Sequence, residues 1–183
     1  GFFMEKIKQR LEFIYGSKYE EIFEKLKKLM DRYRDDEVIR AKNEKYNGKV
    51  SLSEKDSILI TYGDSIVKKG EKPLVTLNKF LKRHVGNSVS GVHILPFFPY
   101  SSDDGFSVVD YKKVNPSLGD WNDIQKIGED YRLMADLVIN HISKKSFWFQ
   151  EFLKGSKKYK DYFISFDDKV DVSNVFRPRM NPL

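Results

Sequence analysis

Two apolar runs, Gly91–Pro96 (GVHILP) and Met134–His141 (MADLVINH), decide the fold of this chain. Each is short, rich in aliphatic residues and flanked by polar residues or glycine, as buried strands are. A long loop, Phe97–Tyr111 (FFPYSSDDGFSVVDY), follows the first run. Polar side chains collect just past the carboxyl end of each run. Because α/β folds place their active sites at that edge of the sheet, the search for function begins there.

The segments around these runs alternate between strand and helix patterns. Ser57–Tyr62 (SILITY) predicts an earlier strand, and Leu74–Val85 carries apolar residues at helical spacing. Asp120 predicts the N-cap of a helix that leads into the last strand, and Ser146–Leu153 predicts a further helix. Such alternation indicates a parallel sheet with helical crossovers. The connection over residues 97–119 is too long for a routine linker, so we expect it to be functional.

The first part of the chain predicts helix from about Glu5 to Tyr46. Within it, Ser17 and Glu20 form a capping-box pattern, in which each side chain binds the other residue's backbone N–H. One face of the following helix is apolar at helical spacing, and we interpret it as core packing. Its residues are Ile22, Phe23, Leu26, Leu29, Met30 and Tyr33. The predicted domains are a helical region over residues 1–50 and a second region over residues 51–183.

The composition narrows the classes of function. The chain has 183 residues, no cysteine and a net charge of +6. The lack of cysteine excludes disulfides, thiolate nucleophiles and cysteine-zinc sites, and it suits a cytoplasmic location. The chain contains no run of about 18 apolar residues, so no membrane span is predicted. Lys and Glu are mixed along the helices, so we interpret the basic excess as a solvated surface and expect no nucleic acid or membrane as a partner.

Asp103 and Phe106 in the long loop allow two interpretations. A carboxylate beside an aromatic ring suits a sugar pocket, whereas Asp-Asp-Gly is also ordinary turn chemistry. His141, at the end of a predicted strand, is either a donor, base or ligand or a structural histidine bonded to backbone. His93, inside a strand, is interpreted as a satisfied core histidine. No phosphate-binding glycine loop or metal-ligand spacing occurs, so neither a cofactor nor a metal is predicted.

Together these motifs resemble the α-amylase clan of glycoside hydrolases, and within it the sucrose phosphorylase group. Asp136–His141 (DLVINH) is similar to the clan's Asp-x-x-x-Asn-His block on the third barrel strand. Gly91–Phe106 (GVHILPFFPYSSDDGF) resembles the phosphorylase form of the second strand and its loop. Ile60–Asp64 resembles the first strand, and Arg177–Leu183 the approach to the fourth. The resemblance implies an α/β fold, the N-terminal part of a (β/α)8 barrel with about three readable strands, preceded by the helical region.

The resemblance also implies roles for individual residues. The substrate-binding residues would be Asp103 and His141 for the glucosyl hydroxyls, Phe106 as the hydrophobic platform of that sugar, and Tyr62. The supporting residues would be Asp136 and Asn140, which hold the catalytic centre from behind.

The family reaction is retaining and needs an Asp nucleophile and a Glu acid/base about 5–5.5 Å apart. The resemblance places these two residues after the fourth and fifth strands, beyond Leu183. We therefore expect residues 51–183 to be the first part of the barrel, truncated before the fourth strand, with no catalytic residue and no activity alone. The predicted function is a fragment of a phosphorylase that transfers glucosyl from sucrose, sucrose 6-phosphate or glucosylglycerate to inorganic phosphate.

Two alternatives remain open: an α-glucosidase or amylase-type hydrolase of the same clan, and a non-catalytic binding module. The expected partners are the sugar substrate, inorganic phosphate and a second polypeptide that carries the rest of the barrel. The helical N-terminal region favours the sucrose 6-phosphate or glucosylglycerate branch. We also expect the isolated chain to self-associate through strand residues that helices cover only in part. These residues are Ile58, Ile60, Val92, Ile94, Leu137 and Ile139.

Overall fold

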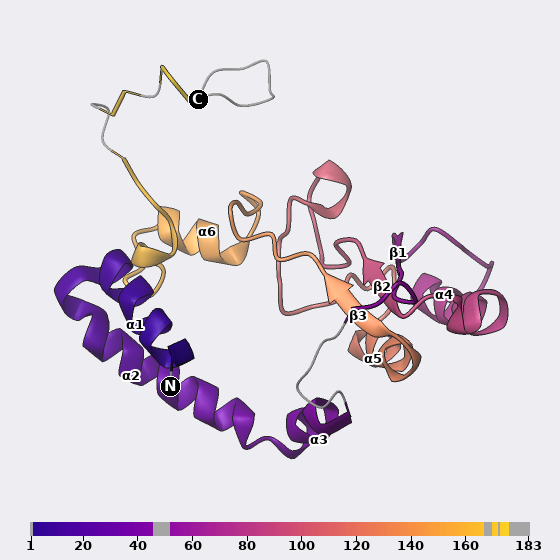
Figure 1. Cartoon of the computed structure of the whole chain (residues 1–183). Helices are drawn as coiled ribbons and strands as arrows, with labels where there is room; N and C mark the ends of the chain where they lie inside the picture. The colour runs from indigo at the N-terminus through magenta and orange to yellow at the C-terminus, as the bar shows by residue number, and fades with distance from the viewer. Residues whose placement is uncertain (1, 46–51, 167–169, 172, 176–183) are drawn as a thin grey trace. The chain divides into compact units, whose positions relative to one another are not determined.

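The chain forms two compact units, residues 1–53 and 54–183. The computed structural model describes residues 2–45, 52–166, 170–171 and 173–175 (Figure 1). Tyr46, the predicted end of the helical run, and the motif at Arg177–Leu183 lie outside the described residues. In the described part of the chain, no helix is long and apolar enough to cross a membrane.

The first unit is helical, as predicted. Its elements are α1 (Phe2–Tyr15), the 3-10 helix η1 (Gly16–Lys18), α2 (Tyr19–Arg34) and α3 (Glu37–Lys45). Helices α1 and α2 pack against each other. Of the apolar face predicted for α2, Phe23 is buried, and the Lys8 ammonium lies 5.0 Å from the centre of its ring. Leu29 and Tyr33 are exposed, so the interpretation of this face as core packing is wrong for these two residues.

The capping box predicted at Ser17 and Glu20 does not form. Ser17 lies inside η1, and α2 begins after Lys18, whose backbone angles are φ −89° and ψ 0° and whose side chain makes no cap. An N-cap residue normally has extended backbone angles, which aim its side-chain oxygen at the first free N–H groups. The 3-10 turn denies Ser17 that geometry. Glu20 instead accepts a 3.3 Å hydrogen bond from the Tyr19 hydroxyl.

The second unit contains the predicted three-stranded parallel sheet. Its strands are β1 (Ile58–Thr61), β2 (Gly91–Ile94) and β3 (Arg132–Ala135), in the order β1-β2-β3. Between β1 and β2 lie α4 (Pro73–Phe80), the π-helix η2 (Leu81–Val85) and the 3-10 helix η3 (Gly86–Ser88). Between β2 and β3 lie the 3-10 helix η4 (Asp103–Gly105) and α5 (Trp121–Asp130), and after β3 come α6 (Phe147–Leu153) and the 3-10 helix η5 (Lys160–Tyr162). Parallel pairing brings the segments after the three strands to one edge of the sheet.

Helices cover one face of the sheet. Val92 and Ile94 of β2 are fully buried in a cluster with residues of α4, η2 and α5. We expected helices to cover these two residues only in part, and that expectation is wrong, because both side chains alternate onto the helix-facing side. The other face remains accessible: Ile60 of β1 is 62% exposed, and Ile58 and Met134 are exposed as well.

Strand β3 is shorter than predicted. It ends at Ala135 rather than at His141, and it pairs with β2 only as far as the last residue of β2. Two residues past β2, Pro96 has no N–H with which to extend a ladder. Leu137 and Ile139, whose composition suggested a strand, are 76% and 74% exposed. The segment after β3 is therefore irregular and depends on other contacts for its position.

Helix α5 begins at the predicted cap. One carboxylate oxygen of Asp120 accepts hydrogen bonds from the backbone N–H groups of Asn122 (2.8 Å) and Asp123 (3.1 Å). Asp123 in turn accepts from the backbone N–H of Asp120 at 3.0 Å. This reciprocal capping box fixes the point where the long loop ends and the helix that leads to β3 begins.

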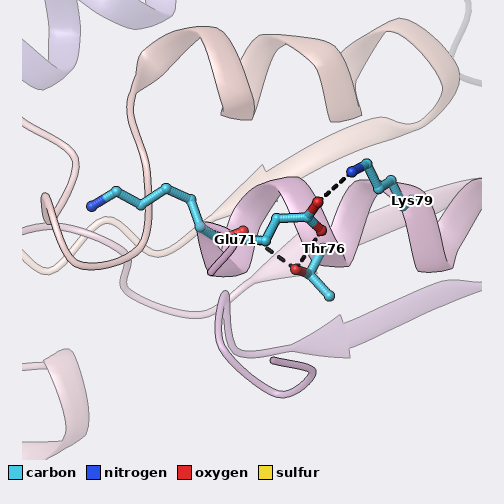
Figure 2. Close-up of polar contacts among 4 residues, drawn as sticks. Glu71, Thr76 and Lys79 are labelled. Atoms are coloured by element: carbon cyan, nitrogen blue, oxygen red, sulfur yellow. Dashed lines mark hydrogen bonds and ion pairs between the residues drawn. The ribbon is translucent and has the colours of Figure 1, made fainter. Parts of the chain in front are cut away.

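A polar cluster fixes the start of α4 (Figure 2). The Thr76 hydroxyl donates a 2.8 Å hydrogen bond to one carboxylate oxygen of Glu71, and the Lys79 ammonium donates to the other. The hydrogen bond from Lys79, followed by that from Thr76, lowers the pKa of the Glu71 carboxyl below its ordinary value. The neighbouring Lys72 donates through Nζ to the carbonyl oxygen of Pro116. The start of α4 is thereby tied to the end of the long loop.

The turn within the long loop depends on Gly105. This residue has φ +98°, and a Cβ placed on it would lie 2.8 Å from the carbonyl oxygen of Pro96. Asp103 and Asp104, which precede it, also have positive φ, at 63° and 48°. Aspartate adopts this left-handed conformation more readily than most residues. Only glycine at position 105 lets the turn lie this close to the backbone that follows β2.

We predict that Gly105→Ala lowers the free energy of unfolding by about 1–3 kcal/mol, because it adds a steric clash to backbone strain. The matched control is Gly155→Ala, at φ +77° with open space around the position. This control should cost only the backbone strain, about 1 kcal/mol. Denaturant unfolding of both variants measures the difference. Equal losses would contradict the close contact between Gly105 and Pro96.

Candidate functional site

The candidate site lies at the carboxyl edge of the sheet. Tyr62 directly follows β1, the long loop follows β2, and Asp136 directly follows β3. The long loop folds back on itself: Tyr100 and Val108 form an antiparallel bridge. The η4 turn, with Asp103 exposed, lies between these two bridge residues. The loop is thus an ordered structure and presents its carboxylates next to the strand ends.

Hydrogen bonds join the long loop to the segment after β3. The Ser143 backbone N–H donates to the Val108 carbonyl oxygen at 2.9 Å, and the hydroxyl oxygens of Ser101 and Ser143 are 2.6 Å apart. His141 Nε2 lies 3.0 Å from the carbonyl oxygen of Phe106. Ser143 is fully buried at this junction. The structure therefore brings His141 and Phe106 together, although 35 residues separate them in the sequence.

The contact between His141 and Phe106 fixes the chemistry of the His141 ring. A carbonyl oxygen only accepts hydrogen bonds, so Nε2 must carry the proton. In the neutral ring, Nδ1 is then an acceptor. As placed here, a neutral His141 offers a ligand an acceptor at Nδ1, which suits the O–H of a sugar, and not a second donor. The structure thus shows the backbone-bonded histidine that was one of the two interpretations of His141. Its role in binding a ligand stays a prediction.

Tyr111 anchors the same segment from the other side. Its hydroxyl donates to the carbonyl oxygen of Val138 and lies 3.0 Å from that of His141. Burial raises the pKa of the Tyr111 hydroxyl, so it stays a donor at neutral pH. Its ring stacks on that of Trp148 in α6, with the ring centres 5.7 Å apart. The sequence prediction missed Tyr111, because no spacing pattern reveals a hydroxyl that bonds to backbone carbonyl groups about 30 residues later in the chain.

His93 and Asp136 form a pair on the uncovered face of the sheet. His93 Nε2 lies 2.9 Å from a carboxylate oxygen of Asp136, and both side chains are largely buried. The prediction that His93 is a satisfied histidine is confirmed, with a carboxylate as its partner. Asp136 was predicted to be a supporting residue, and it links the end of β3 to β2.

Two separate cavities open at this edge. The first, of about 380 Å³, is lined by Tyr62, Asp104 and neighbouring residues of the two loops. The second, of about 460 Å³, is lined by Asn140, His141 and aromatic residues of α6 and the segment after it. The predicted substrate-binding residues are thus divided: Tyr62 and His141 line different cavities, and Asp103 and Phe106 line neither. The substrate-binding roles stay predictions.

Within the described ranges, no group of three or more His, Cys, Asp or Glu side chains is arranged to bind a metal ion. The side chains at the carboxyl edge are instead carboxylates, hydroxyls, two amides, one imidazole and aromatic rings. These groups recognise hydroxyl-rich, uncharged ligands by hydrogen bonds and ring contacts. Parallel strands with helical crossovers, and polar and aromatic groups gathered at their carboxyl edge, are the arrangement of an α/β barrel enzyme.

Comparison with known proteins identifies the family. A family model for the catalytic domain of α-amylases matches residues 83–181, just over half of the chain. The chain belongs to the α-amylase family. The sucrose 6F-phosphate phosphorylase of Thermoanaerobacter thermosaccharolyticum, a solved structure, is 40% identical, with a TM-score of 0.52 over 61% of this chain and 22% of that one. The three strands and their crossovers are therefore part of the (β/α)8 barrel of this family.

Two curated relatives are phosphorylases. The glucosylglycerate phosphorylase of Spirochaeta thermophila is 48% identical over 98% of this chain and 31% of its own length. The sucrose phosphorylase of Streptococcus mutans is 42% identical over 61% of this chain and 23% of its own length. The chain thus spans about a third or less of the length of the relatives that it matches.

We predict that Tyr111→Phe lowers the free energy of unfolding by about 1–2 kcal/mol, because two carbonyl groups lose their hydrogen-bond donor. The same change should broaden or shift the NMR signals of the His141 ring, since its backbone loses an anchor. Tyr100→Phe is the control: the Tyr100 side chain is exposed, so stability should change by less than about 0.5 kcal/mol. Unaltered His141 signals in Tyr111→Phe would contradict the anchoring role.

Proposed function

We propose that this chain contributes the first three strands of the barrel in a retaining α-glucosyl phosphorylase that acts on glucosylglycerate. The observation that carries the proposal is the extent of the match to the Spirochaeta thermophila enzyme, 98% of the chain. That match takes in the helical first unit, whereas the match to the sucrose phosphorylase covers 61% of the chain. The helical unit thus favours glucosylglycerate over sucrose as the glucosyl donor.

In this proposal the carboxyl edge binds the glucosyl unit. Asp103 accepts hydrogen bonds from its hydroxyls, His141 accepts one at Nδ1, and Phe106 provides the apolar platform. The 3.0 Å contact between His141 Nε2 and the Phe106 carbonyl supports the pairing of these two residues in one site. Asp136 supports the site from behind through its bond to His93. Asn140 is proposed to act alongside it, next to His141.

The reaction would proceed in two displacements. A carboxylate nucleophile first forms a glucosyl-enzyme and expels glycerate, whose oxygen takes a proton from the acid/base carboxyl. Phosphate then attacks the glucosyl carbon, and glucose 1-phosphate leaves with the configuration retained. We propose that both carboxylates belong to later strands of the whole barrel, so that the present chain binds the sugar without reacting with it.

The cysteine-free composition supports a cytoplasmic location.

A fusion protein tests this proposal. The chain replaces the matching first 31% of the Spirochaeta thermophila enzyme, and the products of glucosylglycerate and phosphate are measured. We expect glucose 1-phosphate from the fusion and none from the 183-residue chain alone. His141→Ala in the fusion should reduce kcat/KM by about 10²-fold or more, as loss of a transition-state contact does. Glu129→Gln serves as the control: Glu129 is exposed on α5 and lines neither cavity, so the rate should not change.

Other outcomes of the fusion experiment decide against the proposal. Free glucose in place of glucose 1-phosphate indicates a hydrolase of the same family. A folded fusion without either product indicates a module that binds and does not support catalysis. The later loops of the fusion come from the relative, so its donor preference alone says little about this chain. The role of the helical unit is therefore tested by deleting residues 1–53 from the fusion and comparing glucosylglycerate with sucrose as donors. A drop in kcat/KM for glucosylglycerate alone supports the proposed role of the helical unit, and an equal drop for both donors contradicts it.

A further inference from the structure

The cavity that contains Tyr62 has no role in the reaction proposed above. It lies between the turn after β1 and the long loop after β2, and its volume is about 380 Å³. It shares no lining residue with the cavity of His141. Its polar lining includes Tyr62, Asp64, Tyr100, Asp104 and Asn115.

The walls of this cavity are fixed by the fold. A Cβ on Gly63 would lie 3.2 Å from the Leu74 side chain and 3.3 Å from that of Leu118, so the turn after β1 packs tightly against these two residues. The backbone N–H of Leu74 donates to the Leu118 carbonyl oxygen at 3.0 Å, and that of Asn115 donates to Phe97 at 2.8 Å. The cavity is therefore formed before any ligand binds, as small-molecule sites usually are.

Four polar side chains of the cavity have no hydrogen-bond or ion-pair partner among the described residues, whereas Asn115 and Ser117 bond to each other. The carboxylates of Asp64 and Asp104 form no ion pair or hydrogen bond with any described residue, although the net charge of the chain is +6. The hydroxyl groups of Tyr62 and Tyr100 likewise have no described partner. The carbonyl oxygen of the Asn115 side chain accepts from Ser117, which leaves its amide nitrogen as a donor.

These groups select one chemical class of ligand. Two carboxylates in one cavity repel anions such as glycerate or phosphate. The described residues do not provide three acidic or histidine groups for a metal ion. A neutral polyol or sugar fits, because its hydroxyls donate to carboxylates, accept from an amide or a tyrosine, and leave C–H groups for Pro96 and Leu118.

We propose that this cavity is a binding site for a neutral sugar or polyol, separate from the cavity of His141. Asp104 and Asp64 accept hydrogen bonds from its hydroxyls, the Asn115 amide and the Tyr62 hydroxyl donate to them, and Tyr100 closes one side. The proposal concerns binding by this chain and does not depend on phosphorolysis. Failure of the fusion experiment would therefore leave it standing.

Titration of the ¹⁵N-labelled chain with D-glucose and with glycerol tests the proposal. We expect saturable NMR shifts of the Gly63, Asp104 and Ser117 amides at millimolar ligand concentrations. Asp104→Asn should weaken binding about tenfold or more, as loss of a charge-assisted hydrogen bond does. Asparagine also tolerates the φ of +48° at this position, so the turn should remain intact. Tyr62→Phe should weaken binding severalfold.

Matched controls separate this site from its neighbour. Asp161→Asn and Tyr162→Phe carry the same chemical changes outside the cavity, and they should leave the affinity unchanged. Asp103→Asn distinguishes the cavity from the proposed glucosyl site: it should affect the Tyr62 cavity less than Asp104→Asn does. The proposal is overturned if neither ligand gives saturable shifts up to about 0.1 M, well above a millimolar Kd. It is also overturned if only the Asn140 and His141 amides respond, or if glycerate or Ca²⁺ shifts the cavity amides while glucose and glycerol do not.

Discussion

The junction between the long loop and the segment after β3 is the constraint on which the candidate site depends. Because β3 ends at Ala135, no ladder hydrogen bond holds the residues that lead to His141. Their position comes from the Ser143 N–H bond to Val108, from the paired hydroxyls of Ser101 and Ser143, and from the Tyr111 hydroxyl. Ser143 is buried, so breaking its hydrogen bonds is costly, because it leaves an unsatisfied polar group. The junction therefore sets where His141 lies relative to the loop of Asp103 and Phe106.

The two faces of the sheet differ in burial, as the outer and inner faces of a barrel wall do before the barrel is closed. The helix-facing side buries Val92 and Ile94 of β2 fully, although Leu133 of β3 on that side is 39% exposed. On the other side, Ile58, Ile60 and Met134 are exposed. In a (β/α)8 barrel that second side faces the interior, which side chains from the remaining strands fill. The remaining barrel strands would come from the part of the protein that corresponds to the rest of the Spirochaeta thermophila relative, of which this chain spans 31%. The hydrogen bond between His93 and Asp136 places two polar side chains on this accessible side of the sheet.

Local patterns in the sequence predicted local structure well. The parallel strands, α4 and the Asp120 cap followed from spacing and capping rules, because neighbouring residues decide these features. The Ser17 cap was wrong, since a 3-10 turn there replaced the extended backbone that a cap needs. The end of β3 was wrong because Leu137 and Ile139 are apolar yet exposed. The contacts of Tyr111, Ser101 and Ser143 join residues about 30 to 40 positions apart, and no local rule shows such contacts. The division of Tyr62 and His141 between two cavities is of the same kind.

A disulfide cross-link between the long loop and the segment after β3 is the most direct test of the junction. The chain contains no cysteine, so the double variant Ser101→Cys with Ser143→Cys has a single possible intramolecular disulfide. The hydroxyl oxygens of these serines are 2.6 Å apart, which is compatible with the S–S distance of about 2.05 Å once sulfur replaces oxygen. The account predicts near-complete disulfide formation in monomeric protein under mild oxidation, measured by mass spectrometry and thiol titration. Two free thiols in the folded variant under the same conditions would show that the long loop and the segment after β3 do not meet, and would contradict the site described here.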